Sequence, residues 1–533
     1  MRSFPDLRPA FLTALARDRG GNVLMIVAGI ITVLIFAMGF GIDYSRAMKL
    51  QSKLNAAADA AVLAAVNAPM MQQSCTTLSC NAKTAATNMF VQQVTGLTGL
   101  VFNASTDLTV TVATSGSLNN GRVATVTWKA QSKNIFATFL GSTMLALSGT
   151  AQASATKAPY MNFYVMFDTS PSMLLPATST GLSQIMAATA AKANTPYGCA
   201  FACHAMMPRS DSIYVQKNGL DIYLNANYYT SGASGYQTAY QINATTGKVY
   251  DLNGNLMNGY SWSSSKLYYG SSVVSGYYAD GYWLTHNYPS VYTGQSAITL
   301  RIDEERLAAQ ALVPYAQQMA TSNAVTYRMQ MFGFNWTHVG AAGPVTALTS
   351  SMADVNSLST SSVPDLYALQ DWWYKNNMPT SSYSNNDMGT EFTNMLTTML
   401  ATMPIPGDGS TALTPQEVMF LVTDGVADEG VSAVRWNREL HTVDLAQCAL
   451  IKAKGIKIAV LYTEYLPGSL TGDSWSQSNV APYLTKVAPA LQACASTGTD
   501  GSPLFYTVTT DQSISDALVS LFALTVQQAH LVQ

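Results

Sequence analysis

The chain has 533 residues, only 11% of them charged, and a formal net charge of −3. This length exceeds what one ordinary hydrophobic core organises, so we expect two or more domains. The low charge argues against a nucleic-acid-binding protein, which needs a basic face to neutralise phosphates.

The N-terminal region predicts a membrane helix. Residues 23–42, VLMIVAGIITVLIFAMGFGI, carry no charge, and a helix of about 20 residues spans the hydrocarbon core of a bilayer. A cleaved signal peptide is the alternative, but its apolar core is shorter, about 7–15 residues, and ends at a small-residue cleavage site. We therefore expect an uncleaved anchor that follows a cytoplasmic tail over residues 1–20.

The charges that flank this helix lean toward a cytoplasmic N-terminus, because more cationic residues precede the helix than follow it. They are Arg2, Arg8, Arg17 and Arg19 before it and Arg46, Lys49 and Lys53 after it.

The cysteines favour an oxidising compartment. Their number is even and their spacings suggest local disulfides. Zinc is the alternative where His204 stands beside two cysteines in CAFACH, although a zinc site needs four well-placed ligands. The candidate pairs are Cys75 with Cys80, Cys199 with Cys203, and Cys448 with Cys494.

The region after the span predicts a continuing helix and then a small sheet. No Gly or Pro interrupts residues 42–67, so one helix is expected over residues 21–67, its extension being either a stalk or a packing surface. β-branched residues at 107–114 and 122–131 flank the turn SGSLNNG and predict antiparallel strands. Residues 68–155 thus have the outline of a pseudopilin-like α+β region.

Residues 156–533 predict an α/β domain with a parallel sheet. Short apolar runs at 161–168, 326–335, 417–425 and 455–465 are typical of strands buried on both faces. Helical stretches at 300–319, 390–403, 444–455 and 513–528 alternate with them or close the chain. A Tyr-rich segment at about 185–295 predicts a β-rich insertion, either a contact surface or an embellishment held by aromatic packing.

Polar side chains follow the first predicted strand of this domain at alternate positions. Asp168, Ser170 and Ser172 stand in YVMFDTSPSM, and in an open α/β sheet ligands bind beyond the carboxyl ends of the strands. Oxygen donors of this kind suit Mg²⁺. Asp424 in VTDG and Thr390 in MGTEF carry further oxygens at a strand end and a helix start. Taken singly, such residues are more commonly caps and turn formers.

Together, the Asp-x-Ser-x-Ser, Gly-Thr and Thr-Asp-Gly stretches resemble the metal-ion-dependent adhesion site of von Willebrand factor A domains. The resemblance implies a Rossmann-like parallel sheet flanked by helices. It implies direct metal ligation by Ser170 and Ser172, and direct or water-mediated ligation by Asp168, Thr390 and Asp424. The cofactor would be Mg²⁺, or another divalent cation such as Mn²⁺ or Ca²⁺, and its open position would take an acidic residue of a protein partner. In that family the first helix follows the serines closely, whereas residues 173–299 intervene here.

Residues 19–65, RGGNVLMIVAGIITVLIFAMGFGIDYSRAMKLQSKLNAAADAAVLAA, resemble the start of TadG-like proteins of the tight-adherence (Flp) pilus apparatus. Those proteins join a TadE/TadG-type membrane helix to a periplasmic von Willebrand A domain. The resemblance implies a single-pass protein of the bacterial inner membrane, with the bulk of its chain in the periplasm, that assembles the Flp pilus with pilus or secretion components as partners. Self-association is a further option.

Two other functions remain as alternatives. A surface-exposed adhesin would use the same metal site on an extracellular ligand. An A domain serving a cytosolic metal-insertion ATPase would conflict with the membrane helix and the paired cysteines.

Catalytic motifs are missing from the sequence. The five histidines stand outside Gly-x-Ser-x-Gly and His-Glu-x-x-His settings, and there is no Walker-type phosphate loop. We therefore expect a binding and assembly protein rather than an enzyme.

Overall fold

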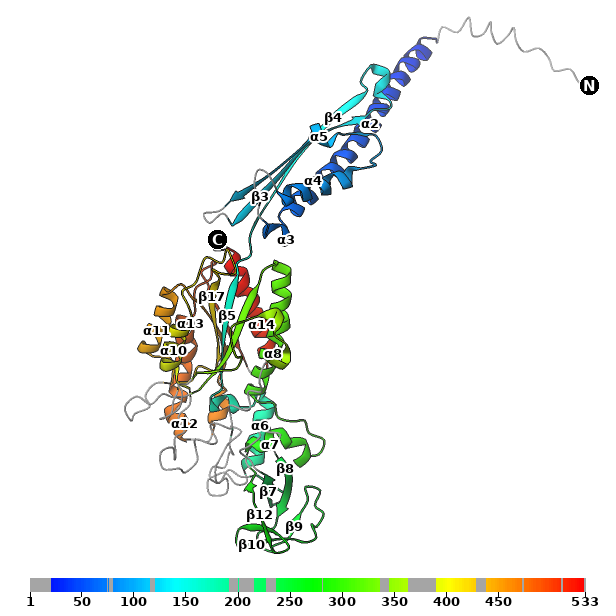
Figure 1. Cartoon of the computed structure of the whole chain (residues 1–533). Coiled ribbons are helices and arrows are strands. Elements are labelled where there is room, and N and C mark those ends of the chain that lie inside the picture. The colour runs from blue at the N-terminus through cyan, green and yellow to red at the C-terminus, as the bar shows by residue number, and fades with distance from the viewer. Residues whose placement is uncertain are drawn as a thin grey trace, which may run out of the picture. The chain divides into compact units, whose positions relative to one another are not determined.

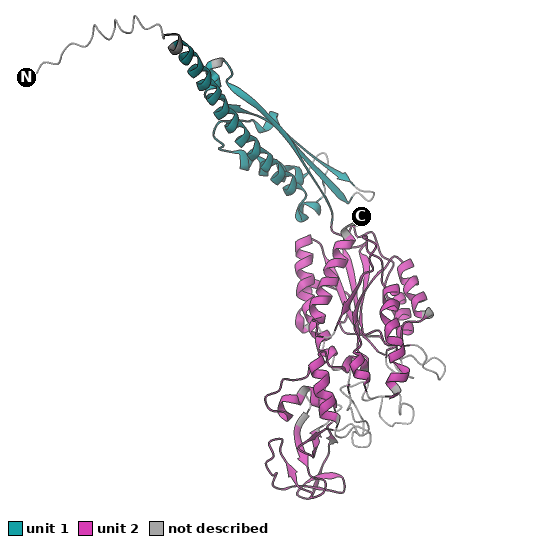
Figure 2. Cartoon of the chain, turned by 180° about the vertical axis from the view of Figure 1, so that it is seen from behind, with its two compact units in different colours: residues 1–157, 533 teal, residues 158–532 magenta. Residues whose placement is uncertain are grey.

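The computed structural model describes residues 21–73, 75, 80–115, 120–190, 200, 215–226, 236–279, 281–335, 345–362, 390–427, 438–471, 474–509 and 511–531. The chain forms two compact units, residues 1–157 with 533 and residues 158–532 (Figure 2). The first unit holds the apolar N-terminal helix, and the second holds the predicted metal ligands.

One continuous helix, α2 (Gly21–Ala65), runs through the predicted span and its extension. Within the described residues it is the one helix long and apolar enough to cross a membrane. Its second half contributes buried side chains such as Leu54 and Ala61 to the core of the first unit. The extension is therefore a packing surface rather than a bare stalk.

The extension packs on an antiparallel sheet, as the alternating pattern predicts. The central strand is β3 (Gly121–Lys133); β4 (Met144–Thr156) pairs with one edge, and β2 (Leu108–Ser115) and β1 (Leu100–Val101) pair with the other. Trp128 on β3 and Phe90 on α4 (Asn81–Val94) are fully buried in the core that the helices and the sheet share. The short helices are α3 (Ala68–Met71), α5 (Ala104–Asp107) and the 3-10 turn η1 (Ala137–Leu140).

The second unit is built on a seven-stranded sheet, drawn in Figure 1, with the order β15-β14-β5-β17-β18-β19. Five strands are parallel: β5 (Met161–Asp168), β14 (Tyr327–Phe334), β17 (Gln416–Thr423), β18 (Lys457–Thr463) and β19 (Phe505–Val508). Both short strands that pair antiparallel with β14, β15 (Val345–Ala347) and β16 (Ala353–Asp354), were not predicted, and neither was β19. All three are too short to leave a periodic signal.

Helices cover both faces of this sheet, which is why its strands read as continuous apolar runs. On one face α8 (Arg301–Asn323) and α14 (Ile514–Leu531) pack on Phe163 and Phe420, and on the other α10 (Phe392–Thr402), α11 (Thr442–Ala453) and α13 (Leu484–Cys494) pack on Met166 and Leu421 (Figure 1). The shorter helices are η2 (Pro171–Leu174), η4 (Val355–Ser357), η5 (Thr360–Ser362), η6 (Pro467–Leu470), α12 (Ser474–Asn479) and η7 (Ala481–Tyr483).

The Tyr-rich segment forms an insertion with two antiparallel sheets and two helices, α6 (Ser179–Ala190) and α7 (Gly281–Val291), which the sequence did not predict. One sheet contains β6 (Gln216–Lys217), β7 (Leu220–Ala226), β8 (Tyr236–Ile242), β9 (Val249–Tyr250) and β13 (Tyr277–Tyr278). The other contains β10 (Tyr260–Ser263), β11 (Lys266–Tyr269) and β12 (Ser272–Val274).

The chain enters and leaves the insertion at one place beside the seven-stranded sheet, which we call the stem. Pro176 and Leu300 form an antiparallel bridge there, the Ala177 N–H donates to Thr299 O at 2.9 Å, and the Arg301 N–H donates to Leu175 O at 2.9 Å. Because of these contacts, α8 begins close to the loop of Ser170 and Ser172, although residues 173–299 separate that loop from α8 in the sequence.

Candidate metal site

The predicted ligands of the second unit gather at the carboxyl edge of its parallel sheet. Asp168 ends β5, and Asp424 follows directly after β17. These two strands are neighbours in parallel register, with Phe167 opposite Val422. Adjacent parallel strands that end together bring the two carboxylates to the same place.

Three of the five predicted ligands, Asp168, Ser170 and Ser172, form a continuous hydrogen-bonded chain. The Ser170 N–H donates to Asp168 Oδ1 at 3.0 Å, and the hydroxyls of Ser170 and Ser172 lie 2.9 Å apart. The Ser172 hydroxyl also lies near Asp424 and lowers the pKa of that carboxyl group. Thr423 Oγ1 donates to Asp168 Oδ2 at 2.5 Å. The alternate spacing in the sequence thus directs the oxygens toward one another.

Thr390, the fifth predicted ligand, is buried at the same edge. It precedes α10, and the N–H of the following residue, Glu391, donates to Asn335 O at 2.8 Å. Asn335 comes directly after β14 and donates its side-chain amide to Thr169 O at 2.9 Å. This relay ties the start of α10 to the loop that holds the two serines.

The turn after Asp424 depends on glycine. Gly425 has a φ of +69°, and a Cβ there would lie 2.6 Å from Leu491 Cδ1 on α13. The Val426 N–H then donates to Asp424 Oδ1 at 3.1 Å. A side chain at position 425 would push this carboxylate out of place.

Helix α8 adds two charged residues that the sequence analysis did not identify. Glu305 Oε1 accepts the Asp168 N–H at 3.2 Å, and Arg301 Nη1 lies 3.6 Å from Asp424 Oδ2. Glu305 is fully buried, and its Oε2 has no hydrogen-bond partner among the described residues. One signal could have revealed them: Arg301 and Glu305 are four residues apart, in line with the buried Ala308 and Leu312.

Burial strongly shifts the pKa values of the carboxyl groups at this site. Burial and the nearby charge of Asp424 together raise the pKa of Asp168 to about 7, against hydrogen bonds from Ser170 and Thr423. Burial, with the charge of Asp168, raises the pKa of Glu305 well above its usual range. Burial also raises the pKa of Asp424, although Arg301 opposes this shift. Of these three buried carboxyl groups, only Asp424 is paired with the buried guanidinium of Arg301 among the described residues.

The residues present fit a hard divalent cation that keeps some of its water. Among the described residues, no three His, Cys, Asp or Glu side chains lie close enough to hold a metal ion by themselves. A metal here would therefore depend on hydroxyl oxygens and water as well as the two aspartates, a donor set that Mg²⁺ accepts. A cation would also offset the excess of buried negative charge.

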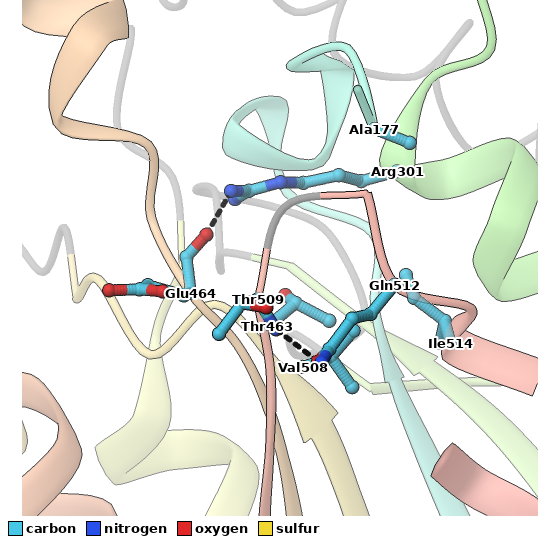
Figure 3. Close-up of a pocket in the computed structure, with 8 residues that line it drawn as sticks. All are labelled: Ala177, Arg301, Thr463, Glu464, Val508, Thr509, Gln512 and Ile514. Atoms are coloured by element: carbon cyan, nitrogen blue, oxygen red, sulfur yellow. Dashed lines mark hydrogen bonds between the residues drawn. The ribbon is translucent and has the colours of Figure 1, made fainter. Parts of the chain in front are cut away.

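A small cavity lies beside Arg301 (Figure 3). Its volume of about 20 Å³ has room for one water molecule. Arg301 Nη2 donates to Glu464 O at its rim, and the Thr463 hydroxyl has no hydrogen-bond partner among the described residues. The cavity suits a structural water rather than a substrate. Its lining consists of Ala177, Arg301, Thr463, Glu464, Val508, Thr509, Gln512 and Ile514.

Two of the three predicted cysteine pairs are joined. Cys75 bonds to Cys80 in the first unit, and Cys448 bonds to Cys494 between α11 and α13 in the second. Cys199, Cys203 and the zinc alternative with His204 lie outside the described residues.

Known structures resemble this chain only weakly. The pilus adhesin SpaC from Lactobacillus rhamnosus GG matches at 8% identity with a TM-score of 0.28, over 79% of this chain and 34% of the adhesin. The open conformation of SpaC matches at 12% identity with a TM-score of 0.25, over 43% of this chain and 28% of the adhesin. Proximal thread matrix protein 1 from the mussel byssus matches at 14% identity with a TM-score of 0.22, over 42% of this chain and 43% of that protein. The chain therefore spans about a third of the adhesin's length, and these scores do not define its fold.

Comparison with protein families identifies a domain in the N-terminal region. No curated protein sequence matches significantly. Residues 21–68, which contain α2, match the family model of the TadE/G-like Flp pilus-assembly domain. The chain thus carries a TadE/G-like domain with a candidate single-pass membrane anchor, and this match supports a role in Flp pilus assembly.

Proposed function

We propose that this protein is a component of Flp pilus assembly, anchored in the bacterial inner membrane by α2, with its second unit in the periplasm. The family match over residues 21–68 and the exposed apolar half of α2 support the anchor. Two disulfides, one in each unit, fit an oxidising compartment outside the cytoplasm.

We further propose that the second unit is a von Willebrand A domain that binds Mg²⁺ or a similar divalent cation. Ser170 and Ser172 would bind the ion directly, and Asp168, Thr390 and Asp424 would bind it directly or through water. The observation that carries this proposal is the hydrogen-bonded chain from the buried Asp168 through the two serines, at the carboxyl edge of the sheet and beside the buried Asp424. The bound ion would supply an open coordination position for an acidic residue of a pilus or secretion partner.

The two aspartates of the proposed site are held in place by their neighbours. Asp168 and Asp424 are buried and tied to neighbouring hydroxyls and N–H groups, so their oxygens are fixed before the ion arrives. Arg301 holds Asp424 from the side of α8. A pre-organised site of this kind loses little entropy when it binds.

The role we propose is binding rather than catalysis. His441 is the one histidine whose side chain the structure describes, and its Nδ1 lies 3.1 Å from Asp444 Oδ2 at the start of α11. This cap stabilises the helix end.

Calorimetric titration of Mg²⁺ into the full chain in detergent tests the metal site. We expect one binding event in the wild type and its loss in Asp168→Asn and in Ser172→Ala. Asp500→Asn is the matched control, because Asp500 lies in an exposed turn of the same unit. Equal affinity for Mg²⁺ in the wild type and Asp168→Asn would refute the metal site.

A further inference from the structure

The turn between β3 and β4 exposes a cluster of apolar side chains. Phe139 is 84% exposed and Ile135 is 54% exposed, and Phe136 and Met144 are exposed beside them. Beyond residue 44, the described residues of the first unit expose five large hydrophobic side chains, and this turn holds four of them, Leu63 being the fifth. Such a concentration of apolar surface marks an interaction site.

The turn is attached directly to α2. The carboxylate of Asp43 accepts the N–H groups of Ile135, Phe136 and Ala137 at 2.9, 2.9 and 2.8 Å. Four residues earlier on the helix, a Cβ at Gly39 would lie 2.6 Å from Phe136 Cβ. Only glycine at position 39 lets the turn come this close, so the two elements move together.

The contact at Gly39 sets the depth of the turn relative to a bilayer. Residues 20–42, between Arg19 and Asp43, are the 23 uncharged residues available to cross the membrane. A helix needs about 20 residues to cross the hydrocarbon core. Every window of that length within residues 20–42 contains Gly39. Phe136, which contacts Gly39, therefore reaches the hydrocarbon boundary wherever the helix sits.

We propose that this turn, residues 134–144, docks into the membrane surface as a second lipid contact of the first unit. The inference rests on the proposed anchoring of α2. Phe139 and Ile135 would bury their side chains at the boundary between headgroups and acyl chains, as apolar residues of interfacial segments do. Tyr44, 60% exposed on the adjoining turn of α2, is of a residue type enriched at this level.

The same geometry explains how a carboxylate is tolerated at the boundary. Asp43 is buried, and three N–H groups of the turn saturate it. A charge without partners would be costly at this depth. The N–H groups of the turn and the carboxylate of α2 thus supply each other's hydrogen bonds at the membrane surface.

Site-specific lipid quenching in the full chain, reconstituted in vesicles, tests the docking. A thiol-reactive fluorophore is placed at Thr138→Cys in the turn, at Val33→Cys in mid-span and at Ser154→Cys, an exposed position at the far end of β4. Wild type without an added cysteine gives the background. We expect quenching by nitroxide-labelled acyl chains at 33 and 138, and none at 154. Adding Phe139→Ser to Thr138→Cys should reduce quenching at 138 toward the value at 154, and Phe139 is exposed enough for this change to leave folding intact.

The outcomes separate this inference from the anchor on which it rests. Quenching at 33 without quenching at 138 would overturn the docking and leave the anchor standing. No quenching at 33 would overturn both. A label at 138 that is shielded from water but not quenched by lipid would assign the turn to a second copy of the chain or another protein, and would also overturn the proposal.

Discussion

At the scale of single residues, the candidate site is defined by an imbalance of buried charge. Asp168, Glu305 and Asp424 are fully buried, and Arg301 is the cation that faces them from α8. Such a group of carboxyl groups titrates differently in the folded and unfolded chain, which makes the stability of the metal-free protein depend on pH.

The first prediction concerns this dependence. Asp168 has a pKa of about 7 in the folded protein, above its value of about 3.9 in an unfolded chain. Between these values the folded state binds the proton more tightly, so stability falls as the pH rises from about 4 to 7. With EDTA present, the second unit should unfold at a higher temperature at pH 5 than at pH 8. The difference between these two pH values corresponds to about 3 kcal/mol for one such carboxyl group.

Magnesium and one variant serve as controls for this pH effect. Saturating Mg²⁺ should stabilise the protein at pH 8 and shrink the difference, and Asp168→Asn should also reduce it. A metal-free wild type that is equally stable at both pH values would contradict the charge imbalance.

The second prediction concerns Arg301. Replacing it with Met leaves Asp424 buried without its ion pair, which typically costs about 3–5 kcal/mol. Denaturant unfolding in EDTA should show this loss, and Mg²⁺ should restore part of it by supplying the missing positive charge. Lys486→Met is the control, because Lys486 forms an exposed ion pair with Glu439 worth less than about 1 kcal/mol. An Arg301→Met variant as stable as this control would show that the pair is not structural.

From the sequence, the polar residues at the carboxyl edge of the sheet could be predicted better than the charged residues that α8 adds there. Asp168 and Asp424 stand at strand ends, where the α/β pattern directs attention, and Ser170 and Ser172 continue from Asp168 in the hydrogen-bonded chain. Glu305 and Arg301 lie within a helix whose charges would ordinarily be solvated. Only the packing of α8 on the sheet makes them internal, and the one local sign of that packing is their helical spacing in line with Ala308 and Leu312.

At the scale of elements, the disulfides show which parts are cross-linked. Cys448 and Cys494 join α11 to α13, two helices on the same face of the sheet. The bond closes a loop with a sequence separation of 46, whereas the bond between Cys75 and Cys80 closes one of 5. In the chain-entropy account, the longer loop contributes more stability.

The third prediction follows from these loop lengths. Cys448→Ala with Cys494→Ala should destabilise the second unit by about 4 kcal/mol, and Cys75→Ala with Cys80→Ala should destabilise the first by about 2 kcal/mol. Denaturant unfolding of the oxidised proteins, followed by probes in each unit, measures both values. Equal losses would show that strain or residual structure, rather than loop length, decides the effect.

The elements that sequence patterns predicted are the long and periodic ones. Helix α2 and strands β3, β5 and β17 each have a clear apolar pattern. The short strands β15 and β16 exist because β14 offers them an edge, and α6 and α7 form inside a segment whose tyrosines suggested strands alone.

At the scale of the whole molecule, the fourth prediction concerns topology. If α2 anchors the chain with its second unit in the periplasm, the protein should be recovered in the inner-membrane fraction. It should be protected from protease in intact cells and digested after the outer membrane is opened. A cytoplasmic protein of known location and an outer-membrane surface protein are the controls. Digestion in intact cells would instead favour the adhesin alternative.

The path of the chain between the serines and α8 could not be read from the sequence. Residues 173–299 intervene, and the pattern of α/β domains expects a helix there at once. The bridge between Pro176 and Leu300 resolves this conflict, because it closes the insertion before the helix begins. This contact between residues so far apart in sequence has no local signature.

The stem also bears on how such a chain can evolve. A segment that departs and returns through one bridged pair of residues can be lengthened, exchanged or lost by recombination without shifting the register of the sheet behind it. Among proteins of this architecture, natural variation should therefore concentrate in the length and composition of the insertion. Leu175 and Arg301 at the stem should vary less, because a hydrogen bond joins their backbones. Selection can then change the surface at this end of the molecule without refolding the sheet behind it.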